Sequence, residues 1–120
     1  MPNISSLRAQ LRDDLLKLVS NCTFLDGVFS VERFNRVSAR TRTEDHIELR
    51  QVYPGKTAEE LAHAVARVQH LNEIALQYVC AAVDKSPDQA SLLAKVFDDN
   101  PGFSRQTYDL ALNDAFVAMR

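Results

Sequence analysis

The chain has 120 residues, 46% of them hydrophobic and 25% charged, a composition typical of soluble globular proteins and unlike that of disordered, fibrous or membrane chains. A formal net charge of −2 argues against a protein that coats nucleic acid over its whole surface, because such chains carry a basic excess. The length suits one hydrophobic core, so we expect residues 1–120 to form a single domain.

Cysteine spacing and the N-terminal residues exclude further classes. Cys22 and Cys80 lie far apart and form no C-x-x-C pair, so neither a disulfide framework nor a zinc site is indicated. The first residues, MPNISSLRAQLRDDLL, alternate in charge where a secretory signal needs an apolar run, and no window has the length of a membrane span. We therefore expect a cytoplasmic protein without a membrane partner. No phosphate-binding loop or dinucleotide motif is present, so no cofactor is predicted.

Two helices are predicted in the first third of the chain. The first covers about residues 6–20, where leucines recur at steps of four and three; they are Leu7, Leu11, Leu15 and Leu18. Ser30 suits the N-cap of a second helix that ends near Arg40 and has Val31, Phe34 and Val37 on one side.

Arginines gather on the opposite side of this second helix. Arg33, Arg36 and Arg40 fall within one narrow sector, and Arg42 follows just beyond. Because arginine binds carboxylates and phosphates with paired hydrogen bonds, this stripe is a candidate docking surface for an acidic protein or a nucleic-acid backbone. The ordinary alternative is a solvated charged face.

Residues 43–53 fit two kinds of element. Ile47 and Leu49 alternate as in a strand, whereas Leu49, Val52 and Tyr53 fit a helix. We favour a helix with Thr43 as its N-cap, ended by the Pro54–Gly55 turn.

A long helix is predicted from the capping box at Thr57–Glu60 to about Asp84. Opposite its apolar stripe lie His63 and His70, together with Glu59 and Glu73. Residues seven apart on a helix are separated by about 10.5 Å along its axis, which is awkward for shared coordination of one ion. We therefore favour a solvated face and predict no metal site; the alternative is a metal-dependent enzyme that uses this His/Glu face over residues 59–73.

The last two helices are marked by their caps. Ser86 and Pro87 open one, Asn100–Pro101–Gly102 ends it, and Ser104 starts the helix that runs to the C-terminus. The final helix has two apolar sides. One is the expected core stripe: Tyr108, Ala111, Leu112, Ala115, Phe116 and Met119. The other recurs every seven residues and is either buried between neighbours or offered to a partner: Phe103, Leu110 and Val117.

Together these patterns predict an all-α, single-domain bundle of five to six helices with short loops. No catalytic residue is predicted. The favoured function is a non-catalytic adaptor or regulatory module that binds another protein, or itself as a homo-oligomer. The predicted contact residues are Arg33, Arg36, Arg40, Arg42, Phe103, Leu110 and Val117. The main alternative is a regulator that contacts nucleic acid through the 33–42 arginines.

Overall fold

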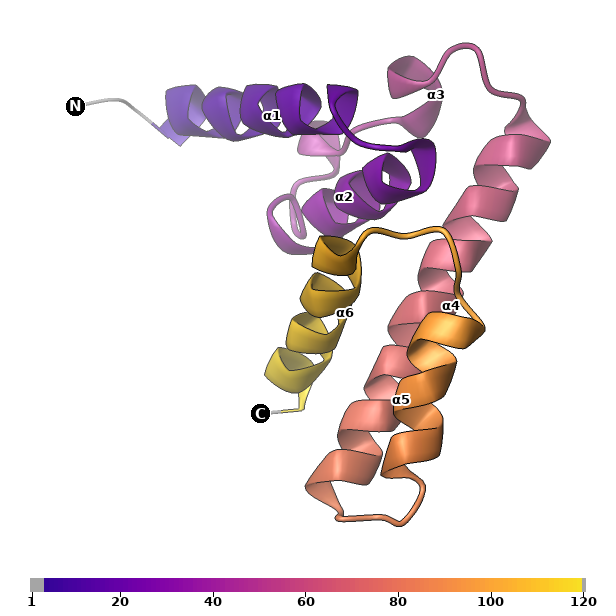
Figure 1. Cartoon of the computed structure of the whole chain (residues 1–120). Helices are drawn as coiled ribbons and strands as arrows, with labels where there is room; N and C mark the ends of the chain where they lie inside the picture. Colours follow the sequence, from indigo (N-terminus) through magenta and orange to yellow (C-terminus); the bar gives the residue numbers. More distant parts are fainter. Residues whose placement is uncertain (1–3, 120) are drawn as a thin grey trace. The chain divides into compact units, whose positions relative to one another are not determined.

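The computed structural model describes residues 4–119, and helices are the only regular elements within them. These residues form six α-helices, labelled in Figure 1, and one 3-10 helix, η1, with these bounds: α1 Ile4–Ser20, α2 Phe24–Val37, η1 Thr43–Asp45, α3 Leu49–Val52, α4 Ala58–Val83, α5 Gln89–Asp98 and α6 Arg105–Ala118. The all-α prediction is confirmed. The contacts divide the chain into two compact units, up to Val65 and from Ala66 onward; a single domain stays a prediction.

α2 begins earlier than predicted, because its N-cap is Thr23 rather than Ser30. The Asp26 amide donates to Thr23 Oγ1 at 3.4 Å, and the Thr23 hydroxyl donates to Asp26 Oδ2 at 3.0 Å. The two side chains thus bond to each other, and the Thr23 hydroxyl satisfies the Asp26 amide, which an open helix end leaves unpaired. The prediction that this helix reaches Arg40 is also wrong, since α2 ends at Val37.

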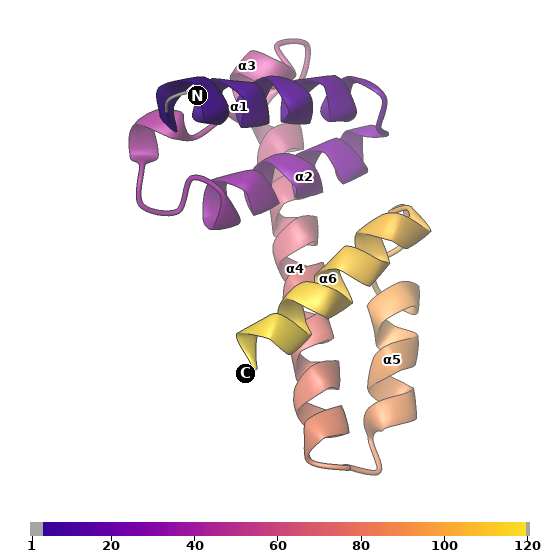
Figure 2. The same ribbon diagram turned by 90° about the vertical axis from the view of Figure 1, so that its left-hand side faces the viewer.

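α1 and α2 lie side by side in Figures 1 and 2 and hold most of the core of the first unit. Its centre is Val19, Val31 and Ile47. Half-buried apolar side chains pack around it: Leu15, Leu16, Phe34, Leu49, Val52 and Tyr53. α1 and α2 are both amphipathic, and their apolar sides pack against each other, as expected for a small α-fold.

The 43–53 segment is helical only in pieces. Ile47 N–H donates to Asn35 Oδ1 at 2.8 Å, and Asn35 Nδ2 donates to the Ile47 carbonyl at 3.0 Å. These bonds hold the backbone between η1 and α3 against α2. They also interrupt the helix that was predicted to run through this segment. Thr43 lies inside η1, whose N-cap position, Arg42, makes no side-chain cap bond, so the Thr43 cap is wrong.

The turn after α3 returns to the start of α2. The Tyr53 ring meets the Phe24 ring edge-on with centroids 4.9 Å apart, and Lys56 Nζ lies 4.6 Å from the Phe24 centroid. The Tyr53 hydroxyl is buried directly over Gly27, where a β-carbon would overlap it. No hydrogen-bond partner for this hydroxyl occurs among the described residues. Gly27 therefore makes room for Tyr53.

The capping box of α4 is confirmed. Glu60 N–H donates to Thr57 Oγ1 at 3.1 Å, and Thr57 N–H donates to Glu60 Oε1 at 3.1 Å. These hydrogen bonds to Thr57 lower the pKa of Glu60, with a smaller contribution from Lys56. The local sequence thus determines where this helix begins.

In the second unit, α4 and α5 form a side-by-side pair in Figures 1 and 2. Asn100 joins them to α6. Its Nδ2 donates to the Val96 carbonyl at 3.2 Å, and its own carbonyl accepts the Tyr108 hydroxyl at 2.6 Å. Ser104 caps α6 as predicted, accepting from the Thr107 amide. α5 begins later than predicted, because its N-cap position is Asp88 rather than Ser86; the Ser86 hydroxyl instead accepts the Asp88 amide at 3.2 Å.

Candidate interaction surfaces

The apolar side chains of α1 divide between a core and the surface. Leu15, Leu16 and Val19 pack in the first unit. Leu7, Leu11 and Leu18 are 51–53% exposed, and their spacing of four and seven residues puts them on one side of the helix. We call these three the leucine face. The sequence stripe had joined Leu15 to them, but Leu15 turns toward α2.

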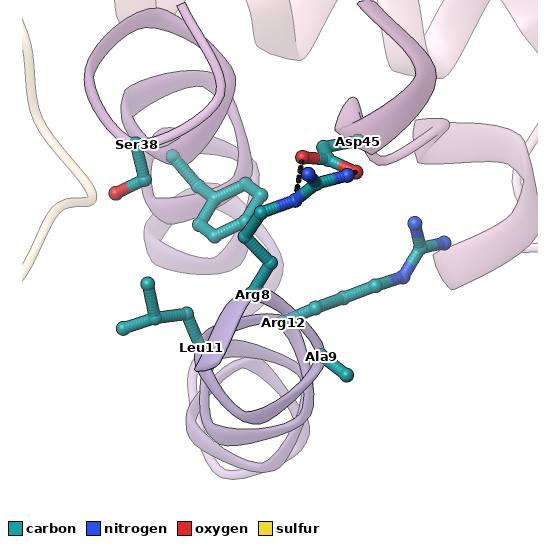
Figure 3. A pocket seen from close by; sticks show the side chains of 7 residues that line it. Arg8, Ala9, Leu11, Arg12, Ser38 and Asp45 are labelled. Atoms are coloured by element: carbon teal, nitrogen blue, oxygen red, sulfur yellow. Dashed lines mark hydrogen bonds and ion pairs between the residues drawn. The ribbon is translucent and has the colours of Figure 1, made fainter. Parts of the chain in front are cut away.

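A pocket opens beside the leucine face, between the first half of α1 and the end of α2 (Figure 3). Its volume is about 230 Å³. We call it the α1–α2 pocket; it is lined by Arg8, Ala9, Leu11, Arg12, Phe34, Ser38 and Asp45. Because Leu11 belongs to both, the pocket and the leucine face are continuous. No sequence pattern predicted this pocket, since it depends on how α1 separates from α2.

Two arginines in the α1–α2 pocket differ in their partners. Arg8 Nη2 donates to Asp45 Oδ1 at 3.0 Å, and Arg8 Nε lies 2.8 Å from Asp45 Oδ2. Arg12, half-buried, forms no ion pair with any residue that the structure describes. In Figure 3 the Arg12 guanidinium and Leu11 extend to opposite sides of Arg8. The pocket therefore has an apolar side and a cationic side.

The predicted arginine stripe is not one helical sector. Arg33 and Arg36 lie on α2, whereas Arg40 and Arg42 follow its end and are exposed. Burial raises the pKa of Glu32, and Arg36 and His46 partly offset this effect. Arg36 therefore acts electrostatically on the nearby Glu32 carboxyl. Arg40 and Arg42 lie on the segment that connects Ser38 to Asp45, two residues of the α1–α2 pocket.

Each of the two apolar sides predicted for the last helix contains both buried and exposed residues. Phe103 precedes α6 and is only 8% exposed, with its ring 5.9 Å from that of Tyr108; of the two alternatives for this apolar side, Phe103 fits burial rather than contact with a partner. Leu110 is half-buried and Val117 is 55% exposed. In the expected core stripe, Tyr108, Ala111 and Ala115 are buried and Leu112 is half-buried, but Phe116 and Met119 are exposed. The last turn of α6 is therefore the apolar part that faces outward.

The two histidines on α4 have different surroundings. Both are exposed, yet His70 Nδ1 lies 2.7 Å from Asn100 Oδ1. Since the Asn100 amide nitrogen already donates to backbone carbonyls, its oxygen must accept, and His70 Nδ1–H donates. His70 therefore helps to hold Asn100, which joins α5 to α6, a structural function that the predicted solvated face did not include. His63 has no such bond among those described.

Groups suited to chemistry are sparse in the described part of the chain. No set of three or more His, Cys, Asp or Glu side chains there is arranged to hold a metal ion. Cys22 and Cys80 are half-buried thiols. Burial, with a smaller effect of Asp26, raises the pKa of Cys22, which is opposite to the shift that activates a nucleophilic thiol.

A second cavity of about 620 Å³ lies between α2 and residues 46–61 and includes His46 and Glu32.

Comparison with protein-family models, with curated proteins and with solved structures gave no match. Within residues 4–119, no helix is both long and apolar enough to cross a lipid bilayer.

Proposed function

We propose that the protein is a non-catalytic interaction module that binds another protein through the leucine face of α1. The observation that carries this proposal is the exposure of Leu7, Leu11 and Leu18, each at least half open to solvent. Isolated exposed apolar side chains are common on proteins. Three on one face, spread over about three helical turns, form the strip that a helical partner covers with its own apolar side chains.

The leucine face alone supports only weak binding. Full burial of one leucine contributes about 1.5–3 kcal/mol, and roughly half of each side chain is already covered. Covering the remainder of all three contributes on the order of 2–4 kcal/mol, which is less than the cost of association in many complexes. A specific complex therefore needs contacts beyond the leucine face.

The nucleic-acid alternative has less support than protein binding. Only two of the four arginines that suggested it, Arg33 and Arg36, lie on α2, and Arg36 is close to Glu32. Phosphate binding also needs several cations that converge along a backbone.

The proposal is tested with the double variant Leu7→Gln/Leu18→Gln, because glutamine is a good helix former of similar length. Val83→Gln is the matched control, since Val83 is 55% exposed on α4. We expect both proteins to keep their unfolding free energy within about 0.5 kcal/mol. Solution mass and affinity capture from the native cell should show that only the α1 variant loses its partner or its self-association. Equal retention by both variants would refute the proposal.

A further inference from the structure

We infer that the α1–α2 pocket binds a short amphipathic segment of a partner protein, with one apolar side chain beside Leu11 and Phe34 and one carboxylate on Arg12. The inference rests on the proposed function and specifies the chemistry of its partner. A segment bound in this pocket would also make the contacts that the leucine face lacks, because Leu11 belongs to both surfaces.

The α1–α2 pocket as a whole is smaller than most cofactor sites. Its volume of about 230 Å³ is below the range of about 300–1,000 Å³ that is usual for small-molecule sites. Leu11 and Phe34 both line it, and the exposed Leu11 side chain continues onto the leucine face. A peptide that lies along α1 can therefore place one bulky apolar residue into the pocket without leaving the leucine face.

The charge of the pocket selects an acidic segment. Asp45 already neutralises Arg8 through two close contacts, whereas Arg12 has no carboxylate partner among the described residues. Arg12 is half-buried as a residue, and a guanidinium can hold a carboxylate with two parallel hydrogen bonds. Arg40 and Arg42 lie on the chain segment between two pocket residues and add positive potential nearby.

An acidic peptide fits this arrangement better than a nucleic-acid backbone. A phosphate backbone repeats its charge at short intervals and needs a row of unpaired cations. Among the described residues, the pocket offers one arginine without an ion pair, Arg12, and its guanidinium lies on the opposite side of Arg8 from Leu11. A segment with one carboxylate and one apolar side chain a short distance apart matches that pattern.

The probe is a display library of randomised 16-residue peptides, selected on the full chain. We expect the enriched peptides to combine a bulky apolar residue with Asp or Glu. In fluorescence anisotropy, Arg12→Glu should weaken synthetic copies of these peptides by at least about tenfold, equivalent to about 1.4 kcal/mol. Lys17→Glu is the control, because it reverses an exposed charge on the same helix. A peptide whose acid is replaced by lysine should regain affinity for the Arg12→Glu protein.

Several outcomes would overturn the inference. They are a failure to enrich any peptide, enriched peptides without an acidic residue, equal losses for Arg12→Glu and Lys17→Glu, or displacement of the peptides by a single-stranded oligonucleotide at lower concentration. If the Leu7→Gln/Leu18→Gln variant loses binding and the Arg12→Glu variant does not, this inference is wrong and the proposed function still holds. Circular dichroism of each variant confirms that the helices are retained.

Discussion

Replacing Gly27 with alanine tests the contact between α2 and Tyr53, which lies in the turn after α3. In an open helix this change stabilises by about 0.8–1.0 kcal/mol, because glycine is a poor helix former. Here the new β-carbon would overlap the Tyr53 hydroxyl and lie 3.3 Å from Val19 Cγ1. Overpacking of this kind costs about 1–3 kcal/mol, and displacing Tyr53 also weakens its edge contact with Phe24, worth about 0.5–1.5 kcal/mol. We expect Gly27→Ala to lower the unfolding free energy by about 1–3 kcal/mol.

The Tyr53→Phe background gives the decisive comparison. Removing a buried hydroxyl that lacks a described partner should be neutral or slightly stabilising. Gly27→Ala should then be nearly neutral, because the nearest remaining ring atom, Tyr53 Cζ in the wild type, is 3.1 Å from the new β-carbon. Urea unfolding of the four proteins, followed by circular dichroism, should give a coupling energy of at least about 1 kcal/mol. An equal loss with tyrosine or phenylalanine at position 53 would refute this account of the turn.

Three further predictions concern side chains whose environment the structure defines. His70→Ala should lower the unfolding free energy by about 1 kcal/mol through loss of its bond to a buried amide, while His63→Ala should change it by less than about 0.5 kcal/mol; equal effects in urea unfolding would contradict the assigned bond. Hydrogen bonds to Thr57 lower the pKa of Glu60 below 4.5, so the stability from its carboxylate is complete above that value and is lost as pH falls through the lowered pKa. The Tm advantage of wild type over Glu60→Gln should therefore shrink in acid, and a constant difference would show that the carboxylate is not responsible. Glu32 has the opposite sign: burial raises its pKa, so Glu32→Gln should raise the Tm at pH 7, and this gain should disappear as acid protonates the wild-type carboxyl.

Helix starts were predictable where the signal is contained within one turn of sequence. The Thr57–Glu60 box and the Ser104 cap satisfy backbone amides three residues away, so composition and spacing identify them. A cap at Thr23–Asp26 is followed directly by Gly27. Glycine is a weak helix former, and its place in α2 follows from the close approach of Tyr53, which no local pattern contains.

The surfaces were less predictable than the helices, because they depend on contacts between distant residues. Periodicity identified α1 but did not tell which leucines face α2, so the exposure of Leu7 and Leu11 emerged only from packing. Likewise, the amide of Asn35 fixes the backbone of Ile47 across 12 residues. The α1–α2 pocket depends on both arrangements and has no signature in the sequence.

The bonds of Asn100 have a consequence for the order of folding events. Its contacts with Val96 and Tyr108 span four and eight residues, whereas its bond to His70 spans 30. Short loops close at a lower entropic cost, so the corner between α5 and α6 should form before α4 is attached to it. Changes at His70 should then speed unfolding and leave the folding rate almost unchanged, whereas changes at Tyr108 should slow folding. The same asparagine would thus belong to an early local turn and to a late long-range contact that limits how quickly this unit opens.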